Sequence, residues 1–130
     1  MLQIMGGEKM CKSMMIVDDE QVFHDLYTEM LEETNYRLIH AYDGDEALEK
    51  LEDKKPDLII LDMLLDMVTG DTFFLYLKGM PDFADIPIIV LSSCNKRDYK
   101  NLLKVDPSIV FLDKGVTSEK LIEEIRKKIG

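Results

Sequence analysis

Five short apolar runs, separated by segments with helical periodicity, restrict the fold of this chain more than any other feature. The runs cover residues 14–17, 38–41, 58–61, 86–91 and 109–112. They lack the alternation of a half-exposed strand, and so indicate parallel strands that are covered on both faces. The segments between and after them carry apolar residues at helical spacing over residues 20–34, 43–53, 72–78, 95–104 and 118–129.

This alternation of strands and helices predicts an α/β fold. Short connections and right-handed crossovers give an open, doubly wound, five-stranded parallel sheet with helices on both faces. A length of 130 residues suits one domain. We expect that domain to span residues 13–130, after a flexible leader at residues 1–12. Asp43 and Glu46 have the spacing of a capping box at the start of the second helix.

Composition excludes several classes of protein. The net charge of −10 disfavours direct binding to nucleic acid or to an anionic membrane surface. No apolar run approaches the roughly 20 residues of a membrane-spanning helix, and the first residues do not resemble a secretory signal. The two cysteines have no metal-binding spacing, which is typical of reduced thiols in a cytoplasmic protein.

Polar residues stand where the apolar runs end. Asp18 and Asp19 follow the first run, Asp62 the third, Ser92 the fourth and Lys114 the fifth. The carboxyl ends of parallel strands share one edge of the sheet, where ligands bind. We therefore expect these five side chains to meet in one pocket.

Three carboxylates at close range repel one another, so either two of them have raised pKa values or a cation neutralises them, and a hard divalent cation is the simpler expectation. Mg²⁺ suits this ligand set, because it takes one or two carboxylates and keeps positions for phosphate oxygens. Lys114 and Ser92 offer a positive charge and a hydroxyl to a transferred phosphoryl group. Asp62 would be the nucleophile.

Each residue also has a simpler interpretation when taken alone. Asp18 or Asp19 could cap the first helix, with Asp18 and Gln21 at suitable spacing. Asp62 and Ser92 could be turn residues. Lys114 could be an ordinary surface charge. These interpretations would all have to hold at once, on one edge of one sheet.

The chain resembles the receiver domains of two-component response regulators from Met14 to Ile129. The resemblance is carried by residues 15–20, 41–48, 56–62 with Gly70 downstream, 87–93 and 111–114. It implies a flavodoxin-like fold with strand order 2-1-3-4-5. It also implies that Asp62 accepts the phosphoryl group, that Asp19 binds Mg²⁺ directly and Asp18 through water, and that the backbone carbonyl of Leu64 binds the metal.

The resemblance assigns three further roles. Ser92 matches a switch hydroxyl, Lys114 a lysine that contacts phosphate, and Phe111 an aromatic residue that changes rotamer on activation. A core aromatic on an edge strand remains the alternative for Phe111.

The chain departs from the family pattern at two positions, and at two others it has apolar or weakly polar side chains. Asp66 and Gly115 stand where the family usually has proline. Asp66 adds acid near the site and changes the stiffness of its loop, and Gly115 leaves the placement of Lys114 open. Leu64 and Cys94 match family positions that often control access of water to the phosphorylated aspartate. Neither offers a good base, which predicts slow self-dephosphorylation.

These features predict a cytoplasmic signalling switch rather than an enzyme with an external substrate. The phosphoryl donor would be a histidine kinase or a phosphotransfer protein. The output surface would be the fourth helix, fifth strand and last helix. Because the sequence stops at Gly130, we expect no attached DNA-binding or enzymatic domain, and therefore a downstream protein target.

Other functions fit the sequence less well. A pseudo-receiver would use the same fold as an interaction module that is independent of phosphorylation. An aspartate-dependent phosphatase needs a second acid where Leu64 stands. A nucleotide hydrolase needs a Gly-Lys-Ser/Thr phosphate loop, and a flavodoxin relative needs a polar phosphate loop after the first strand. Neither loop is present in the sequence.

Overall fold

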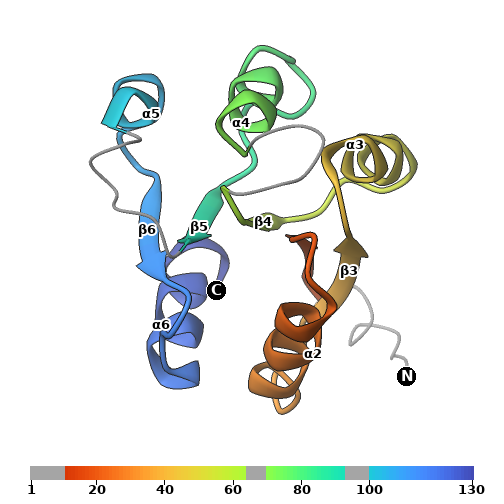
Figure 1. Cartoon of the computed structure of the whole chain (residues 1–130), viewed down its shortest axis with the longest axis vertical. Helices are drawn as coiled ribbons and strands as arrows, with labels where there is room; N and C mark the ends of the chain where they lie inside the picture. The colour runs from red at the N-terminus through yellow and green to blue at the C-terminus, as the bar shows by residue number, and fades with distance from the viewer. Residues whose placement is uncertain (1–10, 64–69, 93–99) are drawn as a thin grey trace, which may run out of the picture.

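The computed structural model of the chain describes residues 11–63, 70–92 and 100–130 (Figure 1). Five parallel strands form one sheet in the order β3-β2-β4-β5-β6, which confirms the predicted class and strand order. The strands are β2 (Ser13–Val17), β3 (Arg37–Ala41), β4 (Leu58–Leu61), β5 (Ile88–Ser92) and β6 (Val110–Asp113).

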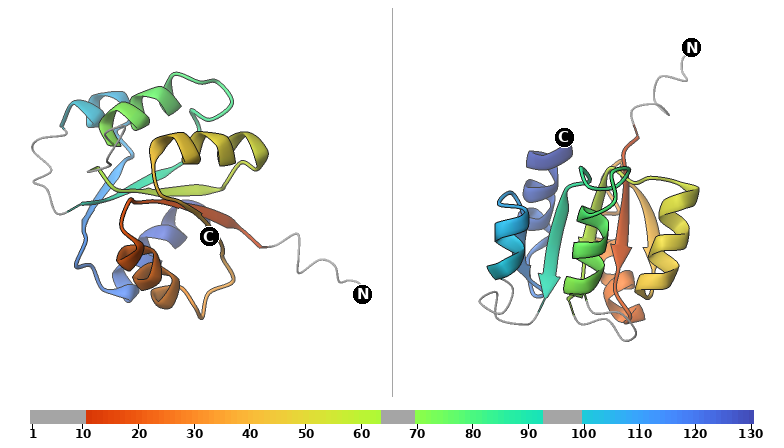
Figure 2. Two further views of the ribbon diagram at one scale, coloured as in Figure 1. Left: turned by 45° about the vertical axis from the view of Figure 1, so that its right-hand side comes forward. Right: turned by 90° about the horizontal axis from the view of Figure 1, so that it is seen from above.

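Helices cover both faces of this sheet. They are α2 (Gln21–Met30), α3 (Gly44–Asp53), α4 (Gly70–Lys78), α5 (Lys100–Val105) and α6 (Ser118–Ile129). α3, α4 and α5 lie on one side, and α2 and α6 lie on the other (Figures 1 and 2). Within the described ranges, no helix is long and apolar enough to cross a membrane.

Each face of the sheet carries its own hydrophobic core, which explains why the strands are apolar throughout. In β2, Met15 and Val17 belong to the cluster under α3 and α4, whereas Met14 and Ile16 belong to the cluster under α2 and α6. All four side chains are completely buried. Successive side chains of a strand point to opposite faces, so a strand between two helical layers has no exposed side.

Several element boundaries differ from the prediction, and two of the differences have clear local reasons. The first helix ends at Met30, because the carbonyl oxygen of Leu31 accepts the amide and the hydroxyl of Thr34 in a closing turn. β5 begins at Ile88 rather than Ile86, since Pro87 has no N–H to donate to a strand ladder. Residues 95–99 of the predicted fourth helix lie outside the described residues, and the described helix begins at Lys100.

The predicted cap of α3 is confirmed. Asp43 is the N-cap residue, and its Oδ1 accepts the Glu46 N–H at 2.7 Å. The carboxylate of Glu46 in turn accepts the Tyr42 N–H at 2.7 Å. The first bond satisfies a backbone donor that the first turn of a helix leaves open, and the second fixes the residue before the cap.

Candidate functional site

The polar residues predicted to converge come from the carboxyl ends of β2, β4 and β6. β2 and β4 are in register, with Val17 opposite Leu61. Asp18 and Asp62 therefore leave the sheet at the same level. The Asp18 N–H donates to the carbonyl of Ala41, and the Asp62 N–H donates to the carbonyl of Val17. These backbone bonds fix both aspartates at one edge of the sheet.

Lys114 lies between these two aspartates. Its Nζ is 3.0 Å from Asp18 Oδ2 and 3.3 Å from Asp62 Oδ2. Asp18 is 1% and Asp62 3% exposed. Burial alone would lower the pKa of Lys114, but its hydrogen bond to Asp18 and the charges of Asp62 and Asp18 outweigh burial and raise that pKa. The lysine is therefore a fixed positive charge at the acidic edge.

The ring of Phe23 also contacts Lys114, in addition to the two carboxylates. The Nζ of Lys114 is 3.9 Å from the centre of the Phe23 ring, within the range of a cation–π interaction. Phe23 is partly buried at the start of α2 and packs against the core under that helix. Sequence reasoning placed Phe23 on the inward stripe of the helix and missed its contact with Lys114.

The loop around Gly115 is held by hydrogen bonds to Asp113. The Gly115 N–H donates to Asp113 Oδ1 at 2.7 Å, and the Val116 N–H donates to the Asp113 carbonyl at 3.0 Å. A Cβ at position 115 would lie 3.1 Å from Asp113 Oδ1. A side chain there would press on the bonded carboxylate, so glycine suits this turn, and Lys114 is placed without a following proline.

Three consecutive acids form a cluster directly after β2. Asp18, Asp19 and Glu20 each offer an oxygen ligand, and these atoms lie within 4.8 Å of one another. The Nζ of Lys114 is 3.8 Å from Glu20 Oε2, so Glu20 also belongs to the acidic edge, a role that sequence reasoning missed. An oxygen-only set of this kind could hold a hard divalent cation.

The capping interpretation of Asp18 is not what the structure shows. The N-cap residue of α2 is Glu20, and its side chain makes no capping hydrogen bond. Asp18 Oδ1 instead accepts the Glu20 N–H at 2.9 Å, before the helix begins. The carboxylate of Asp18 thus shapes the acidic loop and binds Lys114.

Tyr27 is a buried neighbour of the site. It is 1% exposed, and its hydroxyl has no hydrogen-bond partner among the described residues. Burial and the charges of Asp18 and Asp62 raise the pKa of this hydroxyl. Tyr27 therefore stays neutral on the α2 side of the carboxylates.

The remaining predicted residues are described in part or not at all. Ser92 ends β5 opposite Asp113, which places its backbone at the same edge of the sheet; its side chain lies outside the described residues. Leu64, Asp66 and Cys94 also lie outside them. Phe111 is partly buried on β6 and packs against the core under α3 and α4, as expected of a core aromatic.

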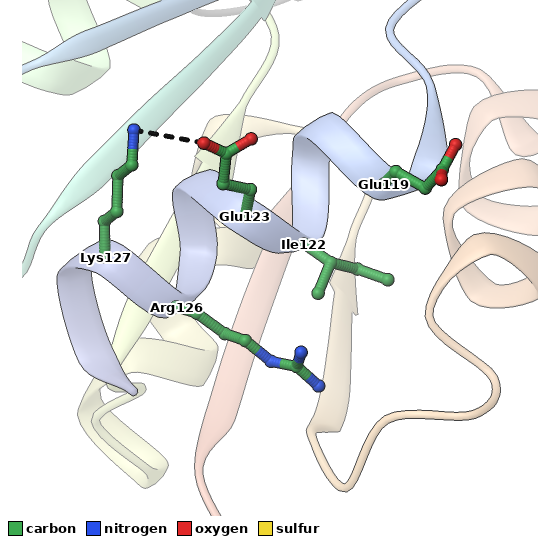
Figure 3. A pocket seen from close by; sticks show the side chains of 5 residues that line it. All are labelled: Glu119, Ile122, Glu123, Arg126 and Lys127. Atoms are coloured by element: carbon green, nitrogen blue, oxygen red, sulfur yellow. Dashed lines mark ion pairs between the residues drawn. The ribbon is translucent and has the colours of Figure 1, made fainter.

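A separate groove lies along α6, away from the acidic cluster. It has a volume of about 600 Å³ and is lined by Glu119, Ile122, Glu123, Arg126 and Lys127 (Figure 3). Glu123 and Lys127 form an ion pair of 3.4 Å on its border. The groove belongs to the last helix, which is part of the predicted output surface.

Comparisons with known proteins identify similar domains over nearly the full length. The profile of the response regulator receiver domain matches residues 14–126. The polar-differentiation response regulator DivK of Brucella anthropi is 27% identical over 121 residues, which cover 93% of this chain and 98% of the relative.

Solved structures show the same fold. The receiver domain of a signal transduction histidine kinase from Syntrophus aciditrophicus is 30% identical, with a TM-score of 0.81 over 92% of this chain and 90% of that one. The receiver domain of a sensor histidine kinase from Pseudomonas aeruginosa is 24% identical, with a TM-score of 0.81 over 92% and 98%. That structure has a magnesium ion coordinated in its active-site cleft.

Proposed function

Because the chain belongs to the response regulator receiver domain family, we propose that it is a signalling switch that accepts a phosphoryl group on Asp62. The observation that carries this proposal is the placement of the Asp62 carboxylate. It lies at the end of the central strand β4, almost fully buried, with the ammonium of Lys114 3.3 Å away. A nucleophile beside a fixed cation is the arrangement that phosphoryl transfer requires.

The oxygen ligands beside it support a magnesium site. Asp18, Asp19 and Asp62, with the backbone carbonyl of Leu64, would hold the ion. The Pseudomonas receiver domain, which has the same fold, has a magnesium ion in its active-site cleft. When bound, Mg²⁺ supplies positive charge that offsets the repulsion among the carboxylates and the incoming phosphate oxygens.

The transfer itself forms one bond and breaks one. A carboxylate oxygen of Asp62 attacks the phosphorus of a phosphohistidine on a histidine kinase or phosphotransfer protein. The new P–O bond forms as the P–N bond breaks, and its electron pair returns to the imidazole nitrogen, which takes up a proton. Lys114 stabilises negative charge on the transferred group. The Ser92 hydroxyl binds the same group afterwards.

Phosphorylation then biases an equilibrium between two conformations, and the side chain of Phe111 changes rotamer between them. The output is binding of a downstream protein in the cytoplasm through α5, β6 and α6. Direct binding of nucleic acid or membrane is not part of this function, in keeping with a net charge of −10.

Mass spectrometry after incubation with acetyl phosphate and Mg²⁺ tests the proposal. We expect the mass of one phosphoryl group to be gained by the wild-type protein and by Asp45→Asn, a control on α3 away from the site. Asp62→Asn is expected to gain none. If the wild-type protein gains no mass, or if Asp62→Asn gains as much, Asp62 is not the acceptor, and a pseudo-receiver becomes the better description.

A further inference from the structure

The two histidines of the chain lie against each other beside the acidic cluster, and the proposed transfer uses neither of them. His24 is on α2 and His40 is on β3, and their Nδ1 atoms are 2.7 Å apart. His24 is 1% exposed, and its Nε2 is 2.7 Å from the carbonyl oxygen of Asp18. A chain of two imidazoles thus connects the edge strand β3 to the first acid of the loop.

The hydrogen bond to the carbonyl oxygen shows where the protons of this pair lie. A carbonyl only accepts hydrogen bonds, so His24 Nε2 carries a hydrogen. The Nδ1 of a neutral His24 is then the acceptor, and His40 Nδ1 is the donor. Burial, His24 and Lys50 lower the pKa of His40 against a smaller opposing effect of Asp25, which favours its neutral form. The two rings therefore hold opposite tautomers.

Neighbouring groups restrain the ring of His24 and the backbone of His40. The ring of Tyr42 lies 4.1 Å from that of His24, centre to centre, at an angle of 34°. The two imidazole centres are 4.9 Å apart. Lys50 on α3 donates to the backbone carbonyl of His40 at 2.5 Å. Residues of α2, β3 and α3 thus form or contact the pair, and His24 is buried.

We propose that His24 is a positioning residue for the magnesium and phosphoryl site, and that His40 sets its tautomer. This inference rests on the proposed function. The Nε2–H of His24 fixes the Asp18 carbonyl, and through it the backbone orientation that directs one carboxylate oxygen to the Glu20 N–H and the other to Lys114. Without the donor, the backbone must turn toward water to satisfy a buried oxygen, and the carboxylate turns with it.

The tautomers provide the first test, and they can be observed without magnesium or phosphate. Two-bond ¹H–¹⁵N correlation spectra distinguish a protonated from an unprotonated ring nitrogen. We expect Nε2–H in His24 and Nδ1–H in His40. In His40→Phe, His24 loses its donor, and we expect its signals to shift toward a mixture of tautomers. A wild-type His24 with a bare Nε2 would overturn the inference.

Magnesium affinity provides the second test. It is measured from the amide signals of the acidic loop while Mg²⁺ is titrated into the protein. We expect His24→Leu to bind Mg²⁺ about 3–10-fold more weakly, the effect of one lost hydrogen bond. His24→Gln places an amide donor near the Nε2 position, and we expect it to recover most of the affinity. Val22→Ala, on the same helix and 64% exposed, is the matched control and should behave as wild type.

The rescue separates positioning from a packing role. If His24→Leu is folded and binds Mg²⁺ as tightly as the wild-type protein, the inference is wrong; it is equally wrong if His24→Gln fails to recover. If His24→Leu does not fold, His40→Phe decides, with weaker magnesium binding supporting the inference and unchanged binding opposing it. Wild-type protein without magnesium affinity would overturn the proposed function, and the positioning role with it.

Discussion

The ammonium group of Lys114 lies 3.9 Å from the centre of the Phe23 ring, so that the lysine is held by an aromatic face as well as by two carboxylates. The loop that carries the lysine continues through a glycine instead of a proline. Glycine restrains the backbone less than proline would. Phe23 therefore adds restraint on the lysine side chain, from the side of α2.

Replacing Phe23 tests this support. Phe23→Leu keeps an apolar side chain but removes the ring, and we expect phosphorylation by acetyl phosphate to slow by about two- to fivefold, which corresponds to a cation–π interaction of about 0.5–1 kcal/mol. Phe23→Tyr keeps the ring face and should react at nearly the wild-type rate. Equal rates for all three proteins would show that the contact does not position Lys114.

Magnesium should stabilise the fold through the acidic cluster. We expect the unfolding temperature to rise when Mg²⁺ is added and to return when a chelator removes it, because a ligand of the native state shifts the unfolding equilibrium. Asp19→Asn should lose most of this rise, whereas the control Asp45→Asn should keep it. A rise that persists in Asp19→Asn would place the cation elsewhere. Differential scanning calorimetry makes the measurement.

The ion pair between Lys78 and Asp106 predicts a pH-dependent contribution to stability. Their charged atoms are 3.0 Å apart, and the side chains are 12% and 15% exposed. Burial would raise the pKa of Asp106, but hydrogen bonds from Ser108 and Lys78 and the Lys78 charge lower it below its ordinary value of 3.8. Its stabilising effect is therefore complete well above pH 3.8 and is lost as the pH falls through the folded-state pKa.

Asp106→Asn tests that contribution. We expect the substitution to lower the free energy of unfolding by about 1–3 kcal/mol near neutral pH, since Lys78 is left partly buried without its partner. Below the folded-state pKa of Asp106, the variant and the wild-type protein should unfold at similar denaturant concentrations. A difference that stays constant across this range would assign the effect to packing instead of charge.

The lifetime of phosphorylated Asp62 provides a further prediction. Leu64 and Cys94 offer no good base to orient an attacking water, so we expect slow loss of the phosphoryl group. Leu64→Asn introduces a polar side chain and should shorten the lifetime severalfold. The intensity of the phosphorylated mass after removal of the donor measures the decay. Rapid decay that Leu64→Asn leaves unchanged would contradict this account.

Topology explains how much of the site could be predicted. The periodicity alone identifies the sheet, and residues 58–61 and 118–129 form the strand and helix expected of them. Once the strands are parallel, their carboxyl ends share an edge, so the meeting of Asp18, Asp62 and Lys114 follows from residue order. No knowledge of side-chain positions is needed for that step.

Contacts that depend on side-chain direction could not be predicted. A helical stripe shows that Phe23 faces inward, but it does not show that its ring meets the lysine that follows β6. The pairing of His24 and His40 depends on how closely α2 and β3 approach at one point. The end of α2 depends on a turn closed by Thr34, and local propensity gives no sign of it.

Lys114 is bonded to the same carboxylates that a cation would use, and this sharing has a consequence for regulation. The lysine is an internal counterion, so a magnesium ion bound as proposed would compete with it for Asp18 and Asp62 oxygens instead of entering a site of bare charge. Under the proposed function, the ion pairs of Lys114 with Asp18 and Asp62 would therefore help set the magnesium concentration at which the protein responds.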